Sequence, residues 1–236
     1  FNLHQQLKIL GFLTLLTFIP FILVMMTSFT RLTIIFHFLR QALATQTVPS
    51  NQLVIGLSLI LTGFIMHPVI NNIQENALIP YLNNTMKDTA EVRTGVKRED
   101  QLMMERAWTP LRNFMISHTR EKDMMLFIDM SKTHINESKE TKVGSIPTAP
   151  TADSQYTLDN VAWYVVVPSF VLSELRTAFM MGFLLFLPFL VIDMVIASVL
   201  MSMGMMMLPP ALISMPFKLM LFILVDGWRL IVEQAV

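Results

Sequence analysis

The sequence predicts an all-α membrane protein, in which two hydrophobic helical hairpins flank a small polar helical domain. Hydrophobic residues make up 53% of the 236-residue chain and charged residues only 14%, whereas a typical soluble domain carries roughly 25% charged residues. The charges are also unevenly placed: 13 acidic and 11 basic residues lie between Glu75 and Asp159, against 4 acidic and 6 basic elsewhere. The predicted domains are therefore an N-terminal hydrophobic hairpin, a polar domain with a flexible linker, and a C-terminal hydrophobic hairpin, at residues 1–74, 75–160 and 161–236.

The first hairpin is predicted from two apolar runs. The run from Leu7 to Leu43 is broken only by Pro20 and by the polar cluster at 27–31. As one helix rising ~1.5 Å per residue it would exceed a hydrocarbon layer ~30 Å thick, so it protrudes or is not a simple lipid-facing span. A second run at 53–70 follows a polar turn around Pro49, which predicts an antiparallel pair.

The middle segment is predicted to be helical and to face water. Its apolar residues between 98 and 119 recur at helical spacing, which predicts amphipathic helices interrupted at Pro110. Residues 136–160 are rich in Ser, Thr, Pro and charged side chains, a composition typical of a flexible linker.

The second hairpin surrounds an unusual loop. Apolar runs at 161–200 and 212–235 are joined by residues 201–210, which include five methionines, one hydroxyl and no charge. Gly204 and the pair Pro209–Pro210 indicate that helix gives way to loop here. Connecting loops of soluble proteins are normally polar because they face water, so this loop needs another explanation.

Three interpretations of the methionine loop are open from the residues. The methionines can be helix-compatible core filler in a chain that has 20 of them. They can form a thioether site for copper(I), although no Cys exists in the chain and no His lies near the loop. They can also act as a gasket, in which flexible apolar side chains from several copies close a channel against water and ions.

Several charged residues lie in or beside the apolar runs. A charge that faces lipid costs at least ~2.5–3.5 kcal/mol at the bilayer centre, so these side chains are expected to face protein or water. They are expected to pair within the fold, to pair between subunits, or to relay protons. Asp226 and Arg229 are three residues apart and are predicted to pair locally. The full set is Arg31, Glu174, Arg176, Asp193, Asp226 and Arg229.

Other function classes find little support in the sequence. The net charge of zero and pI near 7.2 argue against a nucleic-acid partner. The absence of cysteine excludes disulfides, thiolate metal sites and Cys nucleophiles. The five histidines are scattered, and no HExxH, GxSxG, GxGxxG or Walker-type motif occurs, so we expect no enzyme activity, cofactor or metal site.

Charge placement gives an expectation for orientation. Arg40 and Lys218 lie near the short turns, which carry no acidic residue, so positive-inside counting puts these turns in the cytoplasm. The polar segment and both termini would then lie on the opposite side. A chain that starts at Phe1 without Met fits removal of a signal peptide or trimming.

Sequence motifs over most of the chain resemble those of the FliP family, the flagellar branch of the type III secretion export-gate proteins. The motifs are MMTSFTR at 25–31, FLRQAL at 38–43, PSNQ at 49–52, FIMHPV at 64–69, PLRNFM at 110–115, TREKD at 119–123, SELRTAF at 173–179, PFLVID at 188–193, GMMMLPP at 204–210 and PFKLM at 216–220.

The resemblance implies an architecture that composition cannot give. Five copies would wind with FliQ- and FliR-type subunits into a right-handed helical oligomer around a central pore. This assembly would work with FlhB- and FlhA-type export proteins and pass unfolded substrates. It would belong to the flagellar basal body at the bacterial inner membrane, in contact with lipid. It would sit largely above the bilayer plane, on the periplasmic side.

The resemblance also assigns roles to residues. The gasket of the family falls on Met205, Met206 and Met207, and its subunit contacts fall on Phe114, Phe127 and Glu174. Such a gate is passive, which agrees with the absence of enzyme motifs. A virulence-type (injectisome) export gate and a small-molecule or copper transporter are the alternatives.

Overall fold

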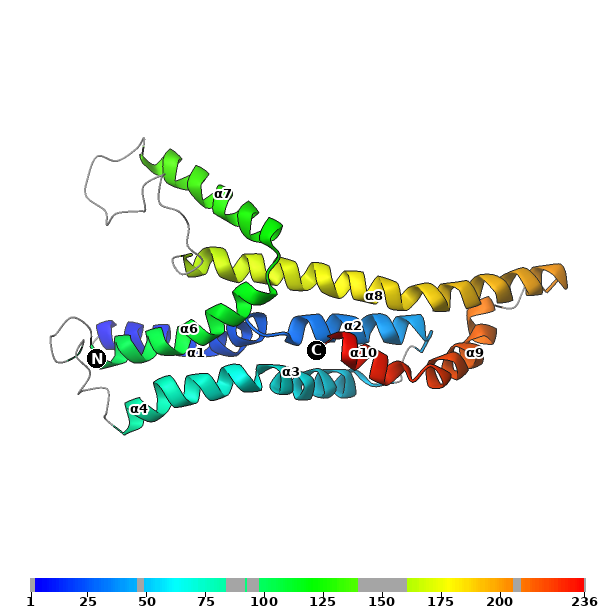
Figure 1. Cartoon of the computed structure of the whole chain (residues 1–236), viewed down its shortest axis with the longest axis horizontal. Coiled ribbons are helices and arrows are strands. Elements are labelled where there is room, and N and C mark those ends of the chain that lie inside the picture. The colour runs from blue at the N-terminus through cyan, green and yellow to red at the C-terminus, as the bar shows by residue number, and fades with distance from the viewer. Residues whose placement is uncertain are drawn as a thin grey trace. The chain divides into compact units, whose positions relative to one another are not determined.

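The computed structural model describes residues 3–45, 49–83, 92, 98–139, 161–205 and 209–235, and the regular structure in them is helical (Figure 1). This confirms the all-α class. In chain order the helices are α1 (Leu3–Met25), α2 (Phe29–Ala42), α3 (Asn51–Ile73), the π-helix η1 (Gln74–Leu78), α4 (Ile79–Leu82), α6 (Glu99–His118), α7 (Glu121–Lys139), α8 (Trp163–Ser202), α9 (Pro210–Leu224) and α10 (Gly227–Ala235).

Contacts along the chain divide it into two compact units. The first unit comprises residues 1–66 and 175–236, and the second comprises residues 67–174. Both α3 and α8 contribute to each unit, because the boundaries at 66 and 174 fall inside these helices. The predicted linker at 136–160 lies outside the described residues except for its start, which belongs to α7.

The first predicted run forms two helices, because the chain breaks at Thr27 and Ser28. The Thr27 hydroxyl donates to the Val24 carbonyl oxygen at 3.0 Å and lies 3.5 Å from the Phe29 amide nitrogen. A side chain that takes over backbone hydrogen bonds in this way ends one helix and begins the next. Pro20 lies inside α1 and does not end it.

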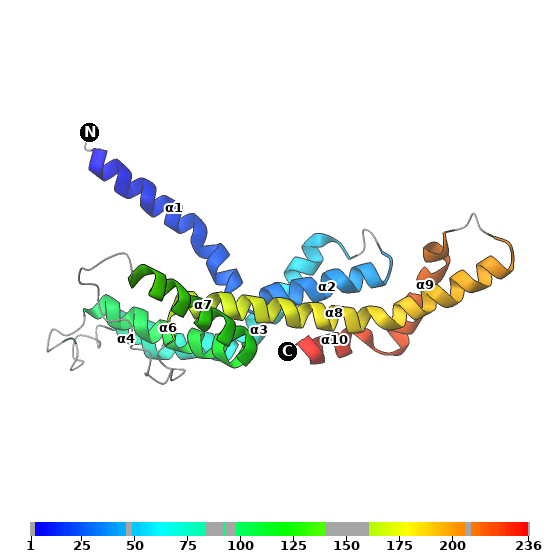
Figure 2. The ribbon, with the colours of Figure 1, turned by 90° about the horizontal axis from the view of Figure 1, so that it is seen from above.

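Helix α2 forms the centre of the first unit. Its buried residues recur every three or four positions, as one face of an amphipathic helix requires. They pack with side chains of α3, α8, α9 and α10, and Figure 2 shows α2 running along α8. The approach to α8 is close at Gly182, where a Cβ atom would overlap the Phe38 ring. The core residues are Leu32, Ile35, Phe36, Leu39, Ala42, Leu43, Val54, Ala178, Phe189, Phe222, Ile231 and Ala235.

In the second unit, α6 is one continuous helix, so the predicted interruption at Pro110 is wrong. The helix runs from Glu99 to His118 with Pro110 inside it. A proline removes one helical hydrogen bond, but buried side chains on both sides of it, Leu102 and Phe114, anchor the two halves of the helix. Phe114 packs against Phe170 of α8 with ring centroids 6.0 Å apart.

Two described helices are long and apolar enough to cross a membrane. They are the continuous helical segment Asn51–Leu82 and α8, which passes through Pro168 and Pro188 without a break. Helices α9 and α10 would form a third span together, but they meet at a 65° bend. The bend follows from Asp226, which adopts a left-handed φ of 52° between the two helices.

Candidate functional site

The methionine loop begins at a well-defined helix end. Gly204 has a φ of +76°, a conformation that suits glycine because it lacks Cβ. Its amide donates to the Met201 carbonyl oxygen, and the Met205 amide donates to the Leu200 carbonyl oxygen, both at 3.0 Å. These two bonds form a Schellman motif, which satisfies carbonyls left over at the end of α8. The predicted change from helix to loop at Gly204 is therefore confirmed.

The far side of the loop is fixed by proline. Pro209 is the N-cap of α9 and Pro210 is its first residue, where the fixed φ of proline suits a helix start. Between the two helix ends, Met203 is 66% exposed and Met205 is 45% exposed. Of the three predicted gasket residues, Met206 and Met207 lie outside the described residues. The described part of the loop thus presents uncharged thioether side chains at its surface.

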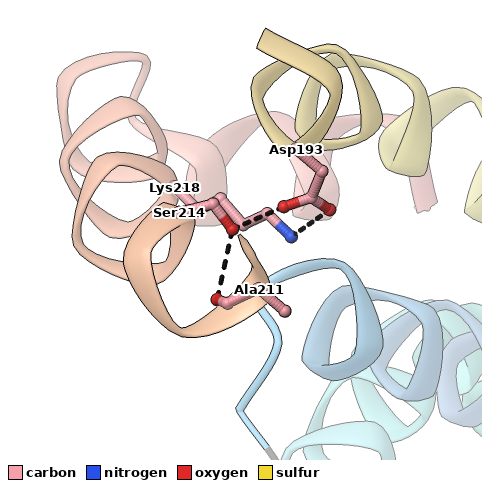
Figure 3. A network of polar contacts seen from close by, with 4 residues as sticks. All are labelled: Asp193, Ala211, Ser214 and Lys218. Carbon is pink, nitrogen blue, oxygen red and sulfur yellow. Dashed lines mark hydrogen bonds and ion pairs between the residues drawn. The ribbon is translucent and has the colours of Figure 1, made fainter. Parts of the chain in front are cut away.

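A buried ion pair joins the two helices that carry the loop (Figure 3). The Lys218 ammonium of α9 lies 2.6 Å from Asp193 Oδ2 of α8. Ser214, one helical turn before Lys218, donates its hydroxyl to the other carboxylate oxygen of Asp193 and also lies 3.2 Å from the Ala211 carbonyl oxygen. Ser214, Lys218 and Phe222 form the buried face of α9. The network therefore ties α8 to α9 below the loop.

The electrostatics of this pair are asymmetric. The Lys218 side chain is 2% exposed and that of Asp193 is 33% exposed. A buried ammonium group without a partner is strongly unfavourable, whereas a paired one is tolerated when geometry and hydrogen bonds are good. Asp193 therefore supplies the charge that allows Lys218 to be buried among apolar helices.

Lys218 was counted for orientation but was not included among the charges in the apolar runs, and its position changes the orientation argument. It is buried in an ion pair inside α9, so it is not a free cation of a cytoplasmic turn. Its pairing with Asp193 had a detectable signal: one acid and one base lie in neighbouring apolar runs with no other charge between 177 and 225. Arg40 alone then carries the positive-inside expectation.

The remaining predicted charges fall in different settings. Arg31 is buried at the start of α2, and Arg176 is exposed. The predicted pair of Asp226 and Arg229 is wrong, because Arg229 Nε instead contacts Glu233 Oε1 at 2.9 Å. Asp226 precedes α10 in the turn, so helical spacing does not apply to it.

The predicted subunit-contact residues all lie in the second unit, with different exposure. Glu174 is 2% exposed and Phe114 is 8% exposed, and Phe127 is half-buried. The ring of Phe114 lies 4.3 Å from that of His118. The hydroxyl of the neighbouring residue Ser173 accepts a hydrogen bond from the Arg120 amide at 3.0 Å. Because Ser173 belongs to α8, this bond fixes the turn between α6 and α7 against that helix. Phe114 and Glu174 thus belong to the interior of this unit.

Among the described residues, no group of three His, Cys, Asp or Glu side chains is placed to hold a metal ion. The charged groups near the loop are instead engaged in the Asp193–Lys218 pair. The described part of the loop offers an apolar, uncharged surface of methionine side chains at the end of the α8–α9 pair.

The fold and the loop define the class of protein. It is an all-helical protein with helices able to span a membrane, and an apolar methionine loop follows a helix pair that a buried ion pair holds together. A model of the FliP family matches residues 12–235. The chain belongs to the FliP family, and the resemblance drawn from its motifs is confirmed.

Relatives of known name cover nearly the whole chain. The flagellar biosynthetic protein FliP of Bacillus subtilis (strain 168) is 43% identical over 237 residues, 99% of this chain and 91% of that protein. The protein of that name from Pectobacterium carotovorum subsp. carotovorum is 44% identical over 226 residues, 96% of this chain and 76% of the relative. The one from Aquifex aeolicus (strain VF5) is 41% identical over 235 residues, 100% and 86% of the two chains.

Proposed function

We propose that this chain is a core, pore-forming subunit of the flagellar type III protein export gate in the bacterial inner membrane. Membership of the FliP family supports the export role, and relatives 41–44% identical that are named flagellar biosynthetic proteins favour the flagellar over the virulence branch. The helices Asn51–Leu82 and α8, both able to cross a membrane, support the location. The polar second unit faces the periplasm, at the flagellar basal body.

The gate assembles from about five copies of this chain with FliQ- and FliR-type subunits, and it works with FlhA- and FlhB-type proteins. Unfolded flagellar substrates pass through its central pore. Phe127 contributes to contacts between copies from the surface of α7, and the buried Phe114 and Glu174 support that surface from inside the second unit.

The observation that carries the gating role is the methionine loop itself. It is uncharged, its described methionines are exposed, and both of its ends are fixed by the Schellman motif and by Pro209–Pro210. Several such loops around an axis form a dry apolar constriction that blocks ions by dewetting. Methionine side chains are flexible, so the constriction yields around polypeptides of varied sequence.

Substitution of the three gasket residues tests this function. Met205→Ala, Met206→Ala and Met207→Ala together remove the side chains that fill the constriction. We expect the assembled complex to form in normal amounts but to leak small ions, measured as conductance in planar bilayers and as loss of membrane potential in cells.

The matched control replaces exposed methionines outside the loop, Met194→Ala with Met220→Ala, which are 66% and 61% exposed. These changes remove similar side chains and should leave conductance unchanged. A triple loop variant that assembles and keeps the resting conductance of the original protein would disprove the gasket.

A further inference from the structure

The first unit carries one acidic residue that its described surroundings do not neutralise. The acidic residues of this unit are Asp193, Asp226 and Glu233. Asp193 pairs with Lys218, and Glu233 pairs with Arg229. In the part of the chain that the structure describes, no base and no hydrogen-bond donor contacts the side chain of Asp226. Asp226 is therefore the carboxylate of this unit that is available to a partner.

Asp226 lies on an exposed apolar projection. Residues 223–226 form the corner where α9 meets α10 at 65°, here called the α9–α10 corner. Ile223 and Leu224 are 75% and 76% exposed, and Val225 is 50% exposed. Close packing fixes the base of the corner, because a Cβ atom on Gly227 would overlap the Phe222 ring. The corner thus presents an apolar surface with a single negative charge.

Arg40 in the same unit is the opposite case, a base without an acid. Its Nη1 donates to Asn51 Oδ1 at 2.9 Å, and its Nη2 lies 3.1 Å from His37 Nδ1. No carboxylate pairs with it among the described residues. A guanidinium has five N–H donors, so several remain for an acceptor. Arg40 is half-buried, whereas Arg176 of α8 is exposed and can be solvated by water, so Arg40 has the greater need of an anion.

An open cavity of about 800 Å³ lies beside Arg40, between the end of α2 and the start of α9. Ile34 and Phe38 of α2 and Leu212 of α9 give it apolar walls, and Arg40 is the charged residue of its lining. An occupant that fits this cavity brings apolar surface together with one negative charge. The α9–α10 corner has these two properties.

The corner of one chain lies away from the cavity of the same chain. The cavity is lined by the face of α2 that carries Ile34, Phe38 and Gln41. Another face of α2 carries Phe36, whose ring lies 6.5 Å from that of Trp228, at the start of α10 just after the corner. The two patches therefore lie on different sides of α2, and a second copy is needed to bring them together. Contact between two different patches is head-to-tail, the type of interface that builds rings and helices.

We propose that the α9–α10 corner of one copy docks into the cavity beside Arg40 of the next copy, where Asp226 pairs with the Arg40 guanidinium. This inference rests on the proposed assembly of several copies. Asp193 and Glu233 are already paired, so Asp226 is the carboxylate that the first unit of another copy can bring. A carboxylate suits the guanidinium, because the two form charge-assisted hydrogen bonds.

Charge reversal tests the pair. The chain is co-expressed with FliQ- and FliR-type subunits and extracted in detergent, and mass photometry measures the yield of the particle of several subunits. Arg40→Glu and Asp226→Arg each place like charges at the contact, so each should lower the yield several-fold. The two changes in one chain restore opposite charges and should return most of the yield.

Two further variants separate charge from backbone and from position. Asp226 has a left-handed φ of 52°, which Asn also adopts readily, so Asp226→Asn removes the charge and keeps the corner. This variant should lower the yield as well. Arg176→Glu reverses an exposed arginine that does not line the cavity, and it should leave the yield unchanged.

Cross-linking tests whether the contact joins two copies. The chain has no cysteine, so introduced cysteines react alone once those of the other subunits are replaced. Two differently tagged copies are co-expressed, one with Gln41→Cys at the cavity and one with Val225→Cys at the corner. A short bis-maleimide should join the two tags. Met194→Cys on α8, 66% exposed, should give no such product when it replaces Val225→Cys.

Three outcomes would overturn the contact while the gate itself stands. The first is an Arg40→Glu chain that assembles as well as the original. The second is a loss of yield in Arg176→Glu that Asp226→Arg restores, which would make Arg176 the partner. The third is a Val225→Cys copy that cross-links to a FliQ- or FliR-type subunit and not to the second tagged copy. An original chain that forms no particle of several subunits would overturn the contact and the proposed gate together.

Discussion

At the scale of single residues, the pair of Asp193 and Lys218 predicts an unequal response to mutation. Asp193→Ala leaves a 2% exposed ammonium without its carboxylate, and breaking a buried pair in this way costs about 3–5 kcal/mol. Lys218→Met costs less, because the remaining carboxylate is 33% exposed and keeps the Ser214 hydroxyl. Thermal unfolding of the purified protein in detergent measures both.

The double variant Asp193→Leu with Lys218→Met separates charge from packing. Apolar residues of similar volume often replace a buried ion pair without loss, so we expect it to be more stable than Asp193→Ala alone. Equal unfolding midpoints for Asp193→Ala and Lys218→Met would contradict the assigned asymmetry.

At the scale of helices, the approach of α2 to α8 predicts opposite effects for two glycines. Gly182→Ala places a Cβ against the Phe38 ring, and overpacking of this kind costs about 1–3 kcal/mol. Gly63→Ala on α3 meets no atom within 4 Å and gains helix propensity of about 0.5–1 kcal/mol. Unfolding midpoints in the same detergent should fall for the first variant and rise for the second. A stable Gly182→Ala protein would show that α2 and α8 have room between them.

The helices show which features of secondary structure can be predicted from the sequence. The long apolar runs at 53–70 and 161–200 predicted α3 and α8, because apolar length by itself indicates a helix in a membrane protein. The run at 212–235 was predicted as one piece, but a 65° bend divides it into α9 and α10. The predicted interruption at Pro110 was wrong, because the packing of Leu102 and Phe114 holds α6 together on both sides of the proline. The turn at Thr27 was harder to place, because a side-chain hydrogen bond to Val24 decides where α1 ends.

At the scale of the whole molecule, local chemistry was easier to predict than pairing across the fold. Gly204 and Pro209 identified the ends of the methionine loop from sequence alone, because their backbone restrictions are local. The partner of Asp193 lies 25 residues further along the chain, and spacing on one helix cannot identify it. The role proposed for the loop, as a seal, depends on neighbouring copies, about which one chain carries no geometric information.

The exposed apolar surface of the first unit gives the last prediction. Phe64, Ile223 and Leu224 are each more than 70% exposed, and so much exposed apolar surface marks contact with lipid or with other chains. If the chain forms a gate, detergent extraction should yield a particle of several subunits with one central hole, measured by mass photometry and electron microscopy. A monomer or dimer without a hole would instead indicate a carrier that works as a single chain.

The buried side chain of Glu174 gives a second prediction for the same particle. Glu174→Ala should lower the yield of the particle, because loss of a buried side chain weakens the packing inside the second unit. Glu233→Ala, on the exposed face of α10, should leave the yield unchanged.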